Sequence, residues 1–358
     1  MQNYSIFFVF LILLWYFCEK YHPIMKAPSQ IDVSVLILFF NRPEPLARVF
    51  EEVRKARPAR LFLFQDGARG ERDVAGVEAC RRVVEQIDWQ CEVHRNYQTK
   101  NLGCDPAEYV SQKWAFSITD KCIVLEDDDV PSQSFFPFCK ELLDRYEHDE
   151  RISLISGYNI DEITPDADGD YFFTSALNIW GWASWKRVID RWDGQYTALD
   201  DERSMALMHG VVKQKGLRKN MIPRFYEHRD TGRAFYESIA QMDLLLTSSL
   251  SILPTKNMIN NIGLMTDSTH FQASGLNTMP KRMRKQFTLK RHETDFPLQH
   301  PKHVIENTAY LERLYRLMAW NHPWIKMGYS LEELWYHLRS GKWSAILSAV
   351  RKRIQRGF

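Results

Sequence analysis

The stretch CIVLEDDDVPS, residues 122–132, contains the pattern that decides the fold. Its apolar run, residues 122–125, is followed at once by four consecutive carboxylates, Glu126 to Asp129. A short apolar run bounded by polar residues indicates a buried strand. Adjacent carboxylates repel one another, so a strand that ends at four of them needs something that offsets this charge. The alternatives are a bound cation, or an exposed acidic turn leading into a helix capped by Ser132 or Ser134.

Similar apolar runs alternate with amphipathic helical patterns through the first half of the chain. The apolar runs are residues 33–40, 61–64, 91–93, 122–125 and 152–155, and the helical patterns are residues 43–56, 74–87, 110–118 and 135–146. Continuous apolar strands that alternate with helices are typical of a mostly parallel sheet covered on both faces. The sequence therefore predicts an α/β fold.

Polar side chains follow three of the predicted strands. They are Asn41-Arg42, Gln65-Asp66-Gly67 and the carboxylates at 126–129. Open α/β sheets bind ligands at the carboxyl ends of their strands. Carboxylate oxygens suit Mg²⁺ or Mn²⁺, which keep positions open for phosphate oxygens. The three clusters together favour a site for a divalent cation and a diphosphate.

The composition excludes some classes of protein. The chain has 358 residues and a formal net charge of +2, which argues against a general nucleic-acid binder. A length of this size predicts one large domain or two ordinary ones. None of the six cysteines forms a CxxC pair, so free thiols in a reducing compartment are the simplest interpretation.

The two ends of the chain differ from this central region. Residues 4–18 are 15 residues without a charge, enough for a helix of about 22 Å, which is shorter than the roughly 30 Å hydrocarbon core. We predict an uncleaved anchor or membrane-dipping helix in residues 1–20; a helix packed on the protein itself is the alternative. Residues 281–292 carry six Lys or Arg and no acid, and the tail from 342 has a basic amphipathic pattern that favours an interfacial or a docked terminal helix. The predicted parts are an anchor at 1–20, an α/β domain at 31–280 and a basic helical extension at 281–358.

Several blocks of sequence follow one another in the order seen in GT-A-fold glycosyltransferases. They are LILFFNRPEPL, LFQDGAR, Asn101-Leu102-Gly103, CIVLEDDDVPS, ISGYN, IWGWASW, NMINNIG and STHF, between about residues 32 and 272. The closest resemblance is to bacterial nucleotide-sugar transferases distantly similar to N-acetylglucosaminyltransferase I. It implies a GT-A (Rossmann-like) fold and a metal-dependent, inverting transfer from a nucleotide-diphosphate sugar.

The resemblance also implies roles for matching residues. Asp128 is the expected ligand of Mn²⁺ or Mg²⁺, with His270 as a second ligand, and the extra Asp129 leaves the register open by one position. Asp66 would accept a hydrogen bond from the base, typically uracil. The residues implied to bind the donor or to shape its sugar pocket are Arg42, Asp66, Asn101, Gly103, Glu126, Asp127, Gly181, Trp182 and Trp185. Read without the resemblance, the tryptophan-rich segment 178–192 is either a sugar-stacking surface or a hydrophobic core.

An inverting transfer also needs a general base that deprotonates the acceptor hydroxyl. Relatives carry an acid about 17 residues before the proline of PTKNMINNIG, which here is Glu237; Asp243 is the second candidate. Relatives usually have Trp-Asp where this chain has Tyr236-Glu237.

The expected partners are a nucleotide-sugar donor, a glycan or lipid-linked acceptor and a membrane, with no nucleic acid. The expected location is the cytoplasmic face of a membrane. Two other functions stay open: a catalytically inactive, membrane-associated relative that binds a glycan or nucleotide, and a sugar nucleotidyltransferase. The second would need a glycine-rich phosphate loop after the first strand, where NRPEPLARV contains no glycine.

Overall fold

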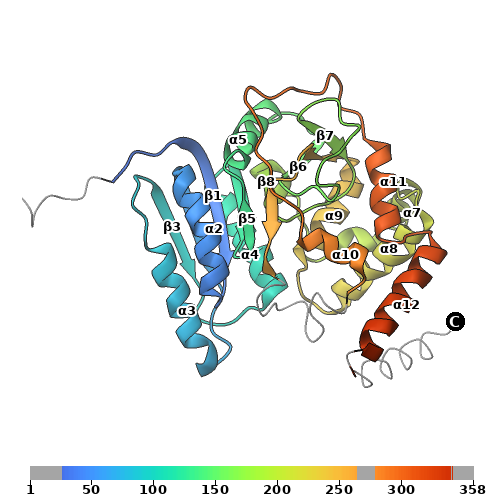
Figure 1. Ribbon diagram of the computed structural model, residues 1–358, viewed down its shortest axis with the longest axis horizontal. Helices are drawn as coiled ribbons and strands as arrows, with labels where there is room; N and C mark the ends of the chain where they lie inside the picture. The colour runs from blue at the N-terminus through green and yellow to red at the C-terminus, as the bar shows by residue number, and fades with distance from the viewer. Residues whose placement is uncertain (1–25, 264–278, 340, 342–358) are drawn as a thin grey trace, which may run out of the picture.

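The computed structural model describes residues 26–263, 279–339 and 341, and a central sheet with helices on both faces dominates this part of the chain (Figure 1). The sheet has eight strands in the order β3-β2-β1-β4-β8-β6-β9-β7. Their bounds are β1 Ile31–Phe39, β2 Pro58–Gln65, β3 Glu92–Tyr97, β4 Lys121–Glu126, β6 Ile152–Ser156, β7 Tyr171–Thr174, β8 Trp182–Trp185 and β9 Leu250–Pro254.

Most of these strands run in one direction. β1 pairs in parallel with β2 and β4, and β2 pairs in parallel with β3. β8 is antiparallel to both of its neighbours, β4 and β6, while β6 is parallel to β9 and β7 is antiparallel to β9. Only β7 and β8 are therefore reversed within the described sheet, and the predicted mostly parallel α/β architecture is confirmed.

Helices cover the two faces of the sheet because the strand side chains alternate between them. Val35 and Ile37 of β1 pack with α2, α3 and α5, whereas Leu36 and Leu38 pack with α4 and the helical region α6 to α9. The longer helices are α2 Pro43–Ala56, α3 Glu71–Val84, α4 Cys104–Ile118, α5 Phe135–Arg145, α7 Glu202–Val211, α8 Lys215–Asp230, α9 Tyr236–Thr247, α11 Thr308–Leu317 and α12 Pro323–Arg339. The short ones are α6 Lys186–Ile189, α10 Lys281–Arg284 and the 3₁₀ turns η1 Thr197–Asp200 and η4 Lys285–Phe287.

The sequence explains where α2 begins and ends. Pro43 occupies its first turn, where a missing N–H costs nothing, and Arg57 ends it in the left-handed conformation. The predicted stripe Leu46, Val49, Phe50 and Val53 is buried against the sheet. Each such side chain stabilises the fold by about 1.5–3 kcal/mol through the apolar surface that it removes from water.

A second, two-stranded sheet brings a late segment of the chain to the acidic cluster. β5 (Asp129–Pro131) pairs antiparallel with β10 (Ile259–Asn261), and Asn261 lies opposite Asp129. The segment NMINNIG therefore lies beside EDDD, although about 130 residues separate the two in sequence.

Residues that follow position 280 pack onto the same core. Leu289 and Leu298 are buried with the side chains of β1 and α5. The five cysteines in the described residues are free thiols. Among the described helices, none has the length and apolar character that a membrane span requires. The predicted anchor at 1–20, His270 and the predicted interfacial tail from 342 lie outside the described residues.

Candidate functional site

The ends of three parallel strands and the start of α4 surround one pocket of about 330 Å³. The strands end side by side because Leu38 of β1 pairs with Glu126 of β4, and Phe39 of β1 pairs with Gln65 of β2. The polar residues that line the pocket are Asn41, Arg42, Asp66, Arg69, Asn101, Glu108, Glu126 and Asp127. The structure thus brings together the three polar clusters that the sequence placed at strand ends.

Asp66 holds the loop that leads into α4. Its Oδ1 accepts from the amides of Gly67 and Leu102, and its Oδ2 accepts from the Gly103 amide and from Nδ2 of Asn101. Burial raises the pKa of Asp66, while the amide hydrogen bonds act in the opposite direction. Four donors occupy the carboxylate, so its evident structural role is to shape the loop that closes one side of the pocket.

Arg42 lies between two carboxylates of the acidic cluster. Its Nη2 donates to Oδ1 of Asp127 and, at 2.8 Å, to Oδ2 of Asp128. Burial raises the pKa of Asp127 to about 6, and the positive charge of Arg42 opposes this shift. Arg42 donates through Nη1 to no residue in the described part of the chain, so this group can bind a ligand in the pocket.

Asp128 and Asp129 have different surroundings. Asp129 is fully buried and structural: its Oδ2 accepts from the Gly181 amide at 2.9 Å and its Oδ1 from Asn261 at 3.1 Å. Asp128 accepts one bond on each oxygen, from Arg42 and from Asn261, and so keeps a free lone pair on both. The geometry therefore favours Asp128 over Asp129 as a ligand, and a metal at Asp128 stays a prediction.

The donor chemistry of Asp128 fits a hard divalent cation. Mg²⁺ is commonly held by one or two carboxylates together with substrate phosphates, without a cage of protein ligands. The described residues contain no group of three His, Cys, Asp or Glu side chains placed to hold a metal ion. His270, the second predicted ligand, lies outside them.

A second group of acids lies beside the pocket and was not predicted as a group. Burial raises the pKa of Glu108 on α4 well above its usual range, and the charge of Glu237 adds to this. Burial acts in the same way on Glu126, with Glu108 as the next cause. The hydroxyl of Tyr236 donates to Oε1 of Glu126 at 3.1 Å. Glu108, Glu126 and Glu237 are therefore close enough to interact, and Tyr236 connects α9 to the end of β4.

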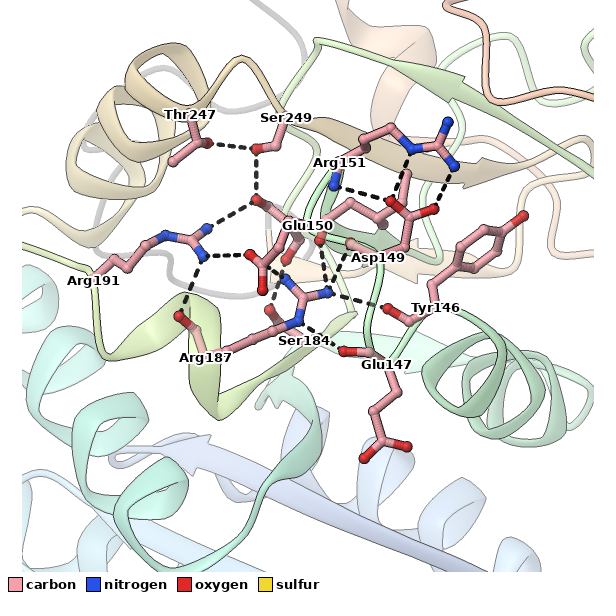
Figure 2. A network of polar contacts seen from close by, with 12 residues as sticks. Tyr146, Glu147, Asp149, Glu150, Arg151, Ser184, Arg187, Arg191, Thr247 and Ser249 are labelled. Atoms are coloured by element: carbon pink, nitrogen blue, oxygen red, sulfur yellow. Dashed lines mark hydrogen bonds and ion pairs between the residues drawn. The ribbon is translucent and has the colours of Figure 1, made fainter.

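The two candidates for the general base lie in different surroundings. Glu237 is exposed in the first turn of α9 and interacts with the acids of the pocket. Asp243 lies about 9 Å further along the same helix. Its carboxylate accepts two bonds of 3.1 Å from Arg191. Figure 2 shows that Arg191 belongs to a network with Arg187, Thr247 and Ser249, and none of these residues lines the pocket.

Gly181, Trp182 and Trp185 lie behind the pocket. Both indoles are buried: Trp182 stacks on Tyr236, and Trp185 donates to the carbonyl of Leu143. Gly181 has φ +58, and a Cβ there would lie 2.5 Å from Ile259. The described structure gives these residues packing roles, and their predicted contact with a donor sugar stays a prediction.

Arg69, Asp73 and Asn41 form a polar network at the mouth of the pocket that the sequence did not reveal. Asp73 accepts from Nε and Nη2 of Arg69 and from Nδ2 of Asn41. These hydrogen bonds, those from Arg69 first, lower the pKa of Asp73 to about 2. The Arg69 guanidinium lies over the ring of Phe40, so a second cation is held beside the pocket. The i, i+4 spacing of Arg69 and Asp73 was the available signal.

Comparisons with known proteins give weak similarities. No protein-family model and no curated protein matches the chain. Mouse xyloside xylosyltransferase 1 (apo form) has a TM-score of 0.33 at 10% identity, over 60% of this chain and 81% of that chain. The inositol-1-phosphate CTP transferase from T. maritima has a TM-score of 0.34 at 10% identity, over 75% of this chain and 100% of that chain. A putative glucose-1-phosphate thymidylyltransferase from Bacillus anthracis, in complex with a sucrose, has a TM-score of 0.26 at 11% identity, over 44% and 73%. Similarity this weak does not identify the reaction, which has to be argued from the site.

Proposed function

We propose that the protein is a metal-dependent, inverting glycosyltransferase that moves a sugar from a nucleotide-diphosphate sugar, most simply a UDP-sugar, to an acceptor hydroxyl. The observation that carries the proposal is the convergence of Arg42, Asp66, Glu126 and Asp127 on one pocket at the carboxyl ends of β1, β2 and β4, with Asp128 bonded to Arg42. This edge is where open α/β sheets bind nucleotides. A pocket with two arginines and several carboxylates can hold a diphosphate and a divalent cation together.

The donor diphosphate would lie between Arg42 and Asp128. Nη1 of Arg42 faces no protein acceptor among the described residues and can donate to a phosphate oxygen, while Arg69 offers a second cation at the mouth. Asp128, with His270 as the second expected ligand, would hold Mn²⁺ or Mg²⁺, which supplies positive charge for the leaving diphosphate. The loop 101–103, which Asp66 fixes, would pack against the nucleotide.

Glu237 would act as the general base. It removes the proton from the acceptor hydroxyl as that oxygen bonds to the anomeric carbon, and the bond from this carbon to the diphosphate oxygen breaks. The products are the glycosylated acceptor, the nucleoside diphosphate and a protonated Glu237. Tyr236, bonded to Glu126, holds the first turn of α9 against the donor pocket and so positions this carboxylate.

A second cavity lies along α9 beyond Glu237, and we assign it to the acceptor. This groove of about 730 Å³ is lined on α9 by Gln241, Leu244, Leu245 and Ser248. Glu237 precedes Gln241 by one turn on the same face of the helix. Opposite α9, Trp180 offers an aromatic surface, and Asn178 is a polar neighbour. Aromatic and amide groups of this kind suit a glycan, whose reacting hydroxyl would have to reach Glu237.

Membrane association completes the proposal. The apolar residues 1–20 would attach the enzyme to the cytoplasmic face, where nucleotide sugars and a lipid-linked acceptor meet. This part depends on the sequence and not on the described structure.

Thermal unfolding and donor turnover test the proposal. UDP with Mn²⁺ should raise the melting temperature, and purified enzyme should slowly hydrolyse at least one UDP-sugar. Asp128→Asn should lose both effects, and the exposed-site control Asp88→Asn should keep them. If UDP bound without turnover of any sugar, the protein would be a catalytically inactive relative. If no nucleotide or nucleotide sugar bound, the proposal would fail.

A further inference from the structure

Helix α12 carries an unusual apolar stripe. Trp324, with 78% of its surface exposed, begins the stripe, and Leu331, at 59%, lies at its centre. The stripe consists of Trp324, Met327, Leu331, Leu334, Trp335 and Leu338. At 3.6 residues per turn these six side chains fall within a sector of about 100° around the helix axis. They form a continuous apolar surface about 21 Å long, because a helix rises about 1.5 Å per residue.

The opposite side of α12 attaches the helix to the rest of the protein. The Tyr329 hydroxyl donates to the carbonyl of Leu317, Glu332 accepts from the Lys281 amide, and Arg284 donates to the Tyr336 hydroxyl. These three residues of α12 share one side, which faces away from the stripe. The contacts that hold α12 to the rest of the described protein are therefore made by this other side. The stripe is not needed for them.

Positive charge lies on the elements that contact the other side of α12 and on the chain that follows it. α10 and η4, which contact α12 through Lys281 and Arg284, hold four Lys or Arg and no acid. α12 adds Lys326 and Arg339 against Glu332 and Glu333. The sequence from 342 to the end carries five more Lys or Arg and no acid. A helix with an apolar face on one side and excess positive charge on the other side has the composition of helices that bind the headgroup region of an anionic bilayer.

We propose that the stripe on α12 is a docking surface for an anionic lipid bilayer. A second copy of the chain suits the charges less well, because a two-fold interface would place the basic flanks of both copies side by side. The inference builds on the proposed membrane association and names the surface that makes contact. It does not depend on the residues of the donor pocket.

Vesicle binding by the full chain tests the inference. Vesicles of phosphatidylcholine with a quarter phosphatidylglycerol should bind the protein more tightly than phosphatidylcholine alone, and added salt should weaken binding. Leu331→Gln with Leu334→Gln should weaken binding about tenfold or more. Val74→Gln, which replaces a similarly exposed apolar residue on α3 at the far end of the molecule, should have no effect (Figure 1).

A depth measurement separates α12 from the predicted anchor at 1–20. In vesicles whose acyl chains carry bromine, the emission of Trp335, obtained as wild type minus Trp335→Phe, should be quenched. Vesicle binding with unquenched Trp335 would overturn the inference, as would no binding. A lipid-free dimer that Leu331→Gln with Leu334→Gln dissociates would assign the stripe to a second copy and also overturn it. Hydrolysis of the donor in detergent should be unchanged in the double variant, so this test and that of the proposed function can fail separately.

Discussion

The hydroxyl of Tyr236 donates a 3.1 Å hydrogen bond to Oε1 of Glu126, across 110 residues of sequence. Tyr236 begins α9, and Glu126 ends β4. The bond therefore joins the helix that carries the proposed base to the strand that carries the acidic cluster. The Tyr236 ring also stacks on Trp182 at a centroid distance of 6.5 Å, and this contact helps to hold the ring that carries the hydroxyl.

Tyr236→Phe should keep this stacking and remove the bond. Glu126 would lose a buried donor, so we expect the free energy of unfolding to fall by about 1–2 kcal/mol. Turnover should fall about tenfold with unchanged affinity for UDP, because the base is less well positioned. Urea unfolding and steady-state kinetics measure the two effects. Tyr146→Phe, which also removes a buried hydroxyl bond, should lose stability but keep its turnover; equal losses of turnover in both variants would contradict the positioning role.

Asp128→Asn and Asp129→Asn should separate metal binding from folding. Asp129 binds the Gly181 amide and Asn261, so Asp129→Asn places a donor against a donor and should cost about 1–3 kcal/mol of stability. Asp128→Asn also turns a donor toward Arg42 or Asn261, so its stability should fall by a similar amount, and in addition it should weaken the binding of Mn²⁺ in the presence of UDP by at least about tenfold. Urea unfolding and a Mn²⁺ titration give the two numbers. If folded Asp129→Asn lost Mn²⁺ binding and Asp128→Asn kept it, the metal ligand would be Asp129 and not Asp128.

Glu237→Gln should affect transfer, whereas Asp243→Asn should affect stability. Glu237→Gln should lower transfer by about 10²-fold or more and leave UDP affinity unchanged, because only proton removal is lost. Asp243→Asn weakens the contact with Arg191, so we expect a lower melting temperature and retained turnover. Transfer that survives in Glu237→Gln and disappears in folded Asp243→Asn would reverse the assignment.

Asp73 should make part of the stability depend on pH. Its pKa of about 2 in the folded protein lies below the ordinary value near 3.9, so the ionised form stabilises the fold. This contribution is complete above the unfolded-state pKa and is lost as the pH falls from about 4 through 2. Asp73→Asn should therefore lower the free energy of unfolding by about 1–2 kcal/mol at neutral pH and by less at low pH. Urea titrations of both proteins across this pH range measure the difference between their free energies of unfolding. A difference that does not change with pH would contradict the stabilising role of ionised Asp73.

The sequence predicted much of the fold because strand and helix periodicity are local signals. The predicted run 33–40 corresponds to β1 (Ile31–Phe39), and the helical pattern 43–56 corresponds to α2 (Pro43–Ala56). β8 was missed because WASW, residues 182–185, has no alternation of apolar and polar residues that would indicate a strand. Its antiparallel place between β4 and β6 depends on pairings distant in sequence.

The site was predicted in part for the same reason. Arg42, Asp66 and Glu126 lie at or just after the ends of strands, and the carboxyl ends of parallel strands meet at one edge. Glu108 lies on helix α4, and its interaction with Glu237 of α9 depends on tertiary packing that the local sequence does not show. The structural roles of Asp129 and Asp243 depend on Gly181, Asn261 and Arg191, contacts that no local pattern predicts.

A crystal structure with UDP and Mn²⁺ tests the central claim most directly. The account predicts an anomalous peak for Mn²⁺ bonded to a carboxylate oxygen of Asp128, with the diphosphate between that ion and Nη1 of Arg42. The uridine should lie against the loop 101–103. A peak bonded to other residues, or a diphosphate bound outside the pocket at the ends of β1, β2 and β4, would contradict it.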